Sequence, residues 1–406
     1  MSWQELLREA LRALRANALR SGLTLLGIII GVGTLVGVIS VIAGLDGFVK
    51  DKVIQLAPDV YVVTRFGLIR SREEFLDALK RRNVDWNDYE IAARTLKLAE
   101  GVAAEGVTSS AVKRGDRRLA DVQVQGTTAN FGPMLRLDIV AGRYFAPAED
   151  QGAVHVAIIG ADVKDELFPQ IGPLGRELLV GGSPYRVIGL LEKQGRVLGE
   201  ERDRKVFIPI QAFRRQFGSR DSLNLLIKAR GGVAGVDASV DEVRALLRAL
   251  RHTPYRGPDP FGVVTAESLT TLWRQISAAA FILSLLIASV SLGVGGIVIM
   301  NIMLVAVVER TREIGVRLAL GARKRDVRRQ FLAEAALLSL AGGLIGVVLG
   351  SLAAFGVRGL LDFPAEVTPG IVSLGIVLAV GVGVAAGYWP ARNASNLAVV
   401  DALRDE

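Results

Sequence analysis

Cysteine is absent from this 406-residue chain, which excludes disulfides and thiolate metal sites. Histidine is scarce too, since His155 and His252 are the only two and lie far apart in the sequence. A metal site needs several clustered ligands, so we expect both histidines to be structural and no metal to be bound. Aromatic residues make up 6% of a chain that is 50% hydrophobic. Abundant aliphatic residues with few aromatic ones favour a membrane protein.

Motifs for catalysis and nucleotide binding are also missing. The chain has no GxxxxGKS or GxxxxGKT phosphate loop, no GxSxG, no HExxH and no convincing pair of acids. We therefore expect no catalytic residue, no bound cofactor and no enzyme activity from this chain alone. The net charge of +8 is compatible with nucleic-acid binding. The basic residues nevertheless stand where membrane topology requires them, so no nucleic-acid partner is predicted.

Four long apolar segments dominate what is present. They predict transmembrane helices over 21–45, 276–308, 331–357 and 370–389, the third interrupted only by Glu334 near its start. No charged residue occurs between Arg274 and Glu309, a run longer than a bilayer requires. Part of the second helix is therefore expected to stand above the membrane and pack against protein.

The first twenty residues form an amphipathic pattern. Leu6, Leu7, Ala10, Leu11 and Leu14 share one helical face, and Arg8, Arg12 and Arg15 share another. This pattern predicts a helix over 1–20 that lies on the cytoplasmic membrane surface. An extension of the first spanning helix is the alternative. A cleaved signal peptide is disfavoured because the apolar run that follows is too long.

The basic residues predict the orientation. Loops rich in Lys and Arg stay in the cytoplasm, and the 309–330 loop contains eight such residues: Arg310, Arg312, Arg317, Arg323, Lys324, Arg325, Arg328 and Arg329. We therefore expect this loop, the N-terminus and the 390–406 tail to be cytoplasmic. The segment 46–275 and the short 358–369 loop are expected outside.

The outside segment 46–275 is large enough for a folded domain and has a mixed α/β pattern. Alternating β-branched residues predict strands at 59–65, 121–127, 153–160 and 222–230. Helical patterns occur at 85–98, opened by an Asp cap candidate, and at 239–251. The Gly- and Pro-rich stretch of about 135–217 predicts a β-rich lobe inserted into an α/β lobe.

Glycine spacing within the apolar segments predicts close helix packing. GxxxG pairs occur at Gly27–Gly31, Gly33–Gly37, Gly342–Gly346, Gly346–Gly350 and Gly383–Gly387. Asn301 is the main strongly polar exception in the spans, and we group it with the packing residues. Solute pathways usually need ionisable groups within the membrane. The pattern therefore favours transmission of movement across the membrane over passage of a polar solute.

These segments resemble the permease half of MacB-type ABC transporters, the FtsX-like permease group. MNIMLVAVVERTREIGVRLALGARKRDV (300–327) is similar to the family's signature, and YWPARNASNLAVVDALRDE (388–406) to its ending. GRYF (142–145) and VAIIG (156–160) are similar to its external core domain. The resemblance implies a dimer of permeases, formed with a second copy or a paralogue, each bound to a cytoplasmic ATPase that carries ATP and Mg. The chain starts directly at the permease, so the ATPase is expected to be a separate polypeptide.

In this family the 309–330 loop holds the helix that docks on the ATPase. The resemblance implies coupling roles for Glu309, Arg310, Thr311, Arg312, Glu313, Ile314, Arg317, Leu318 and Gly321. Thr311 is a candidate N-cap, Ile314 and Leu318 are candidate apolar anchors, and Gly321 is suited to end the helix. A second helix is expected to start near Lys324. The alternative is a topology anchor that contacts anionic lipid.

Two classes of function remain open. The first is a permease of the bacterial cytoplasmic membrane that drives efflux or release of a drug, peptide or lipid-linked molecule, with a periplasmic adaptor as a further partner. The second is an FtsX-like regulator of an external cell-wall hydrolase. Lipoprotein extraction is a related transport option. The large external domain with an inserted lobe favours the first class.

Overall fold

The computed structural model describes residues 18–49, 57–197, 200–218, 221–361 and 364–397. The chain divides into two compact units. The helical unit comprises the described parts of 1–49 and 273–406, and the α/β unit those of 50–272. The predicted surface helix over 1–20 lies almost wholly outside the described residues, as does the end of the 390–406 tail.

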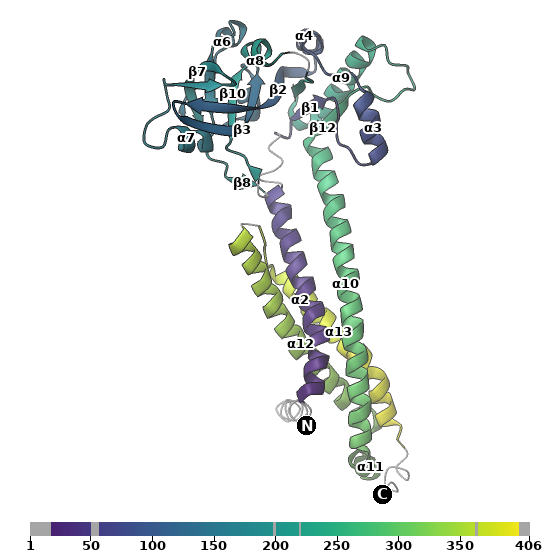
Figure 1. The fold of residues 1–406 in the computed structure, drawn as a ribbon. Coiled ribbons are helices and arrows are strands. Elements are labelled where there is room, and N and C mark those ends of the chain that lie inside the picture. Colours follow the sequence, from purple (N-terminus) through teal and green to yellow (C-terminus); the bar gives the residue numbers. More distant parts are fainter. Residues whose placement is uncertain (1–17, 50–56, 198–199, 219–220, 362–363, 398–406) are drawn as a thin grey trace. The chain divides into compact units, whose positions relative to one another are not determined.

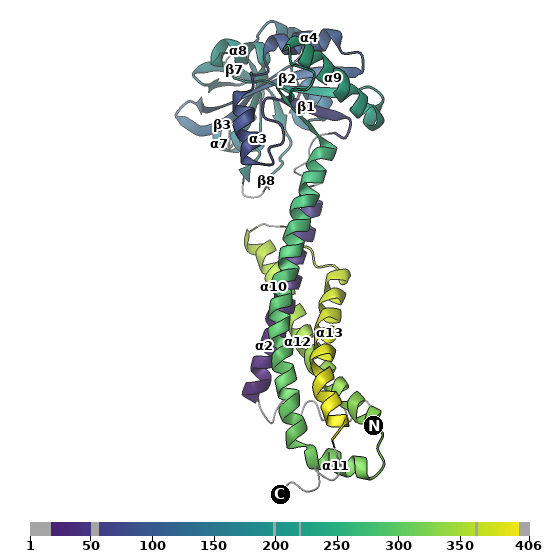
Figure 2. The ribbon, with the colours of Figure 1, turned by 90° about the vertical axis from the view of Figure 1, so that its right-hand side faces the viewer.

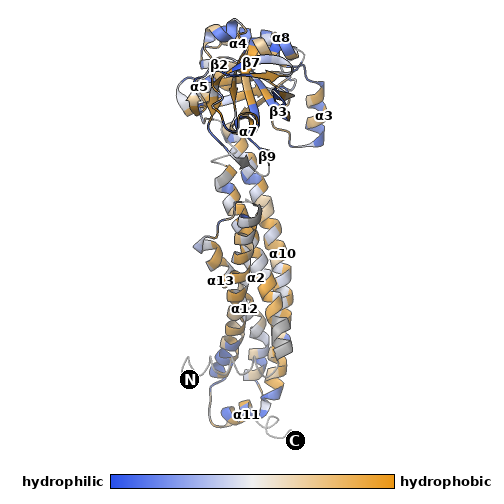
Figure 3. Cartoon of the chain, turned by 60° about the vertical axis from the view of Figure 1, so that its left-hand side comes forward, coloured by the Kyte–Doolittle hydropathy of each residue, from blue (hydrophilic) through white to orange (hydrophobic). Residues whose placement is uncertain are grey.

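Four long helices carry the apolar segments: α2 (Ala18–Phe48), α10 (Ala266–Glu309), α12 (Lys324–Leu361) and α13 (Pro369–Ser395). All four are long and apolar enough to cross a membrane. Apolar residues run along each of them (Figure 3). At 1.5 Å per residue the 44 residues of α10 span about 66 Å, well beyond a hydrocarbon core of about 30 Å. The short helix α11 (Thr311–Ala319) follows α10 and is set crosswise to it (Figure 2).

Glycines bring α2 and α12 close together. A Cβ atom on Gly350 would lie 2.5 Å from the carbonyl oxygen of Gly33, and one on Gly346 would lie 2.9 Å from that of Ile29. Contacts this short leave no room for a side chain without movement of a backbone. The α2–α12 contact therefore depends on these glycines.

Small residues also mediate the contact of α12 with α13. A Cβ on Gly383 would lie 2.0 Å from the Ser339 hydroxyl oxygen, and one on Gly387 would lie 2.6 Å from the Ala335 Cβ. The helix α10 meets α2 at Gly295, whose Cα lies 3.0 Å from the position of a Cβ on Gly27. In all three contacts, the absent side chain lets the backbone of one helix approach the backbone or a small side chain of another.

The α/β unit is built on a ten-stranded sheet (Figure 1). Its strands are β1 (Val60–Thr64), β2 (Ala99–Arg114), β3 (Arg117–Thr127), β4 (Ile139–Gly142), β5 (Val156–Ile159), β6 (Glu177–Val180), β7 (Ser183–Leu191), β10 (Lys205–Pro209), β11 (Asn224–Ala229) and β12 (Gly262–Thr265). The main order is β12-β1-β11-β2-β3-β10-β5-β7-β4, and β6 pairs with β2 and β7. A separate two-stranded ribbon joins β8 (Arg196–Val197) to β9 (Glu200–Glu201).

Alternating side chains give the sheet two apolar faces. In β1, Tyr61 and Val63 belong to one core cluster, and Val60 belongs to another with Ala103 and Phe207. The helices of the unit are α3 (Arg72–Lys80), α4 (Trp86–Thr95), α5 (Phe131–Leu135), α6 (Pro147–Gln151), α7 (Ala161–Leu167), α8 (Ile210–Phe217), the 3-10 turn η2 (Gly232–Gly235) and α9 (Val236–Leu250). Because successive side chains of a strand point to opposite faces, the two clusters lie on opposite faces of the sheet.

The predicted inserted lobe over 135–217 supplies β4 to β10 together with α6, α7 and α8. Its strands extend the same sheet, because β10 pairs with β3 and β6 pairs with β2. The α/β lobe and the insertion are thus joined through the long strands β2 and β3. Strand β2 was not among the predicted strands, because its sequence AEGVAAEGVTSSAVKR is poor in the residues that favour strands.

Candidate functional site

The short helix predicted within 309–330 is present as α11, and it starts at a different residue from the one predicted. Arg310, with φ −105° and ψ 14°, separates α10 from α11 and occupies the N-cap position. Thr311 is the first helical residue, so its assignment as the N-cap is wrong. Its hydroxyl lies 3.0 Å from the Val307 carbonyl oxygen and 2.9 Å from that of Val308, and therefore bonds to the last turn of α10. The residue joins the two helices instead of opening the second.

The apolar side chains of α11 divide between two faces. Ile314 is only 3% exposed and belongs to the same core cluster as Val327 and Phe331 of α12. Leu318, partly buried, packs against that cluster. Ile314 is therefore buried in the core of this chain and cannot contact a partner. Its assignment as an apolar anchor is wrong. The prediction failed because a spacing of four places residues on one face without saying what that face meets.

The opposite face of α11 is open. Val316 is 43% exposed, and Leu320, the C-cap residue directly after α11, is 84% exposed. Arg312 lies on the same stripe four residues before Val316. Glu309 and Glu313 are exposed as well, and Arg317 is half-buried. A short helix with one face in the core and an apolar-basic face outside has the form of a docking element.

A tight turn ends α11. Gly321 has φ +94°, and an added Cβ would meet nothing within 4 Å there, so backbone conformation and not space favours glycine. Gly321 donates its N–H to the Leu318 carbonyl, at 3.1 Å, and Ala322 donates to that of Arg317, at 3.0 Å. Helix α12 begins at Lys324, where the second helix is predicted.

Two polar contacts tie α11 and its N-cap residue to α12. Arg310 donates from Nη1 to Oε2 of Glu334 at 3.3 Å, and Glu334 is 8% exposed. Arg317 donates from Nη1 to Oε1 of Gln330 at 3.0 Å and also pairs with Glu313. The helix is therefore attached near both ends as well as through Ile314.

The remaining predicted packing glycines lie at the same contacts of α2 with α12 and α10. Gly31 faces Leu292, Gly37 faces Gly350, and Gly342 faces Ile28. Asn301 is exposed, so it does not pack against another helix of this chain, and its role in helix packing stays a prediction. Polarity marks a residue as unusual in a span, but the helix face that it occupies depends on tertiary packing.

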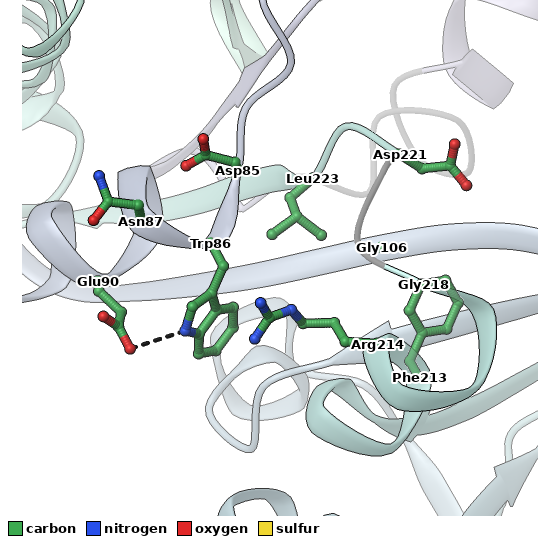
Figure 4. A pocket seen from close by; sticks show the side chains of 10 residues that line it. All are labelled: Asp85, Trp86, Asn87, Glu90, Gly106, Phe213, Arg214, Gly218, Asp221 and Leu223. Atoms are coloured by element: carbon green, nitrogen blue, oxygen red, sulfur yellow. Dashed lines mark hydrogen bonds between the residues drawn. The ribbon is translucent and has the colours of Figure 1, made fainter.

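The α/β unit contains a cavity that the sequence analysis did not predict (Figure 4). It has a volume of about 500 Å³ and lies beside α4 and α8. Trp86 donates its Nε1–H to Oε1 of Glu90 at 2.9 Å, and the Arg214 guanidinium lies over the Trp86 ring, 4.5 Å from its centroid. Asp85 and Asp221 add carboxylates to the wall.

Burial and charge both act on the ionisable groups of this cavity. Burial lowers the pKa of Arg214 below its ordinary value, although Glu90 opposes the shift. Burial would raise the pKa of Asp85, but hydrogen bonds from the Asp88 backbone and from Arg82 outweigh it and the pKa is lowered. Charged side chains and one indole ring thus line the cavity. Among the described residues, no group of three or more His, Cys, Asp or Glu is arranged to hold a metal ion.

Comparison with known proteins identifies both units. Residues 21–249 match the model of the MacB-like periplasmic core domain, and residues 280–399 match the model of the FtsX-like permease C-terminal region. The macrolide export ATP-binding/permease protein MacB of Marinobacter nauticus is 34% identical over 417 residues, covering 100% of this chain and 61% of that protein. The protein of the same name from an Azoarcus species is 34% identical over 406 residues, covering 99% of this chain and 60% of that protein.

The chain therefore spans about three fifths of the length of these two relatives. Among solved structures, the periplasmic region of MacB from Actinobacillus actinomycetemcomitans aligns with a TM-score of 0.46 and 14% identity, covering 55% of this chain and 96% of that one. Together the four apolar helices and the permease match indicate a protein of the inner membrane. The chain belongs to the family of MacB-like, FtsX-like ABC transporter permeases.

Proposed function

We propose that this chain couples ATP hydrolysis by a cytoplasmic ABC ATPase to movement of its α/β unit on the far side of the membrane. The observation that carries the proposal is α11, whose Ile314 is held in the core while Val316 and Leu320 face outward. A rigid helix with exposed apolar residues can transmit a push from a partner. The names of the relatives, which join ATP binding to a permease, support an ATPase as that partner.

The transported molecule is proposed to be a drug, a peptide or a lipid-linked compound that leaves the cell or is released from the membrane. The relatives named for macrolide export support efflux over regulation of an external hydrolase. A second permease copy or a paralogue would complete the membrane part, and a periplasmic adaptor and membrane lipids are further proposed partners. ATP and Mg are assigned to the ATPase, because this sequence contains no phosphate loop.

The docking face can be tested with Val316→Asp and Leu320→Asp. Apolar anchors buried in an interface contribute about 2 kcal/mol or more each, so either substitution should remove most of the ATPase that co-purifies with the chain. Val233→Asp is the control, because Val233 is 65% exposed and lies in the α/β unit. Wild-type recovery of the ATPase with both α11 variants would overturn this docking face.

Orientation is tested with single cysteines in a chain that otherwise has none. Tyr255 is 97% exposed in the α/β unit, so a cysteine there should react with an impermeant thiol reagent. The reagent is added to cells whose inner membrane is intact and whose outer layers let it pass. A cysteine at the exposed position Arg325 should react only after the membrane is opened. The reverse pattern would contradict the proposed topology.

A further inference from the structure

Glu334 is a buried acid in the apolar part of α12. It lies ten residues into α12 and is 8% exposed, in the segment that also contributes Phe331 and Ala335 to the core of the helical unit. Burial of a carboxylate is unfavourable unless charged or hydrogen-bonding partners compensate. An apolar residue would fill this position without that cost. The acid therefore calls for an explanation beyond packing.

One partner of Glu334 is Arg310, the residue between α10 and α11. The guanidinium donates from Nη1 to Oε2 of Glu334 at 3.3 Å, and the Arg310 side chain is about one third exposed. The backbone of Arg310 leaves the helical conformation at this point, with φ −105° and ψ 14°. The ion pair thus connects the break between α10 and α11 to the buried part of α12.

The next residue of α12 is in contact with α13. A Cβ atom on Gly387 would lie 2.6 Å from the Cβ of Ala335, and one on Gly383 would lie 2.9 Å from the Ala335 carbonyl oxygen. Further along α12, Gly346 and Gly350 meet the backbone of α2. A displacement of α12 at Glu334 would therefore reach α13 directly and α2 through the glycine contact, because close-packed backbones transmit displacement.

We propose that Glu334 is a positioning residue that, through Arg310, makes α12 follow α11 when the ATPase moves α11. The inference rests on the proposed coupling function and assigns the entry point of the movement to the joint of α10 and α11. Ile314 and the Arg317–Gln330 contact hold α11 against α12, and the ion pair sets its position at the end nearest α10. Loss of the carboxylate charge would leave the docking face intact but loosen this attachment.

The test uses the full chain with its ABC ATPase in nanodiscs and four variants. Glu334→Gln removes the charge, Glu334→Asp keeps it on a shorter side chain, and Arg310→Glu with Glu334→Arg exchanges the two charges. Glu366→Gln is the matched control, since it removes an exposed carboxylate elsewhere in the helical unit. For each variant we would measure the co-purified ATPase, the kcat and KM for ATP, and the thermal midpoint.

Glu334→Gln should retain the ATPase at the wild-type ratio and keep the KM for ATP, while kcat falls at least tenfold. Glu334→Asp should recover part of kcat, and the charge exchange should recover at least half of it. Wild-type kcat with Glu334→Gln would overturn the proposal. Failure of both rescue variants, with lower thermal midpoints in all three, would also overturn it and leave the pair as a folding element.

Parallel Val316→Asp and Leu320→Asp arms separate this inference from the proposed function. If Val316→Asp and Leu320→Asp both still co-purify the ATPase at the wild-type ratio, the proposed docking face is wrong whatever Glu334 does. If Val316→Asp loses the ATPase while Glu334→Gln keeps a wild-type kcat, only the role of Glu334 is wrong. Loss of the ATPase with Glu334→Gln itself would show that the pair shapes the docking face and would contradict the inference.

Discussion

The interiors of the two units of this protein are packed in different ways. The α/β unit fills its core with large aromatic side chains, and Tyr61, Tyr185, Phe168, Phe207 and Phe261 are fully buried there. The helical unit instead brings backbones together at glycines such as Gly33, Gly346 and Gly350. Water drives apolar side chains into a core. Lipid provides no such drive, so helices in a membrane gain most from close contact.

The two units also differ in their buried ion pairs. In the α/β unit Arg251 pairs with Asp88 at 2.7 Å, and both side chains are almost completely buried. Arg251 also donates to the carbonyl oxygens of Asn83 and Pro260, at 3.2 and 2.7 Å. One arginine thus links α4 to the segment after α9. In the helical unit, Glu334 is a buried acid, and its pair with Arg310 lies next to α11.

The largest effect is expected from Arg251→Met in the α/β unit. It leaves Asp88 buried without its ion-pair partner, which typically destabilises by about 3–5 kcal/mol. Amide hydrogens of α4 and α9 should exchange with deuterium much faster in the variant, while those of α12 should not change. A second substitution, Asp88→Asn, should restore part of the protection. Unchanged exchange in α4 would show that the pair does not hold this unit together.

A smaller effect, about 1–3 kcal/mol, is expected from Gly350→Val in the helical unit. The added Cβ would lie 2.5 Å from the Gly33 carbonyl oxygen and would force α2 and α12 apart. Gly356→Val is the control on the same helix, because a Cβ there meets nothing within 4 Å. The thermal midpoint in nanodiscs should fall only for Gly350→Val. Equal midpoints for the two variants would refute the glycine contact as the basis of this packing.

The helical unit needs glycine for two different reasons: close helix contact at Gly350 and a positive φ at Gly321. At φ +94° an alanine would be strained by about 1–2 kcal/mol, although no atom blocks its Cβ. Gly321→Ala should therefore weaken ATPase co-purification, and Gly321→Asn should weaken it less, because Asn tolerates left-handed backbone better. Equal recovery of the ATPase with Gly321→Ala and the wild type would show that the turn does not position α11.

The smallest effect, below about 1 kcal/mol, concerns an exposed pair in the α/β unit. The hydrogen bond from Arg143 is the main cause that lowers the pKa of Glu149 to about 2 from an ordinary 4.5. Because the folded pKa is lowered, the stabilisation is present above pH 4.5 and is lost as the pH falls towards 2. The thermal midpoint of Arg143→Ala should lie slightly below that of the wild type at pH 6, and the difference should shrink below pH 4.5. A difference that grows with acid would contradict this sign.

Local patterns predicted much of the fold for clear reasons. The apolar runs became α2, α10, α12 and α13, because length and lack of charge suffice to define a span. Asp85 opens α4 with a capping box, where a cap was predicted. Strand β2 was missed because its alanines, glycines and serines favour no strand, and its pairing with β3, β11 and β6 stabilises it instead.

The candidate site was predicted in outline and corrected in detail. Sequence alone settles that 309–330 contains a short amphipathic helix, a glycine turn and a dense basic charge, because these depend on neighbours in the chain. Only tertiary structure decides that Ile314 faces the core and Val316 and Leu320 face outward, since the helical period defines faces but not their partners. Likewise, Arg310 and Glu334 are 24 residues apart in sequence, and their contact exists because α10, α11 and α12 fold back on one another.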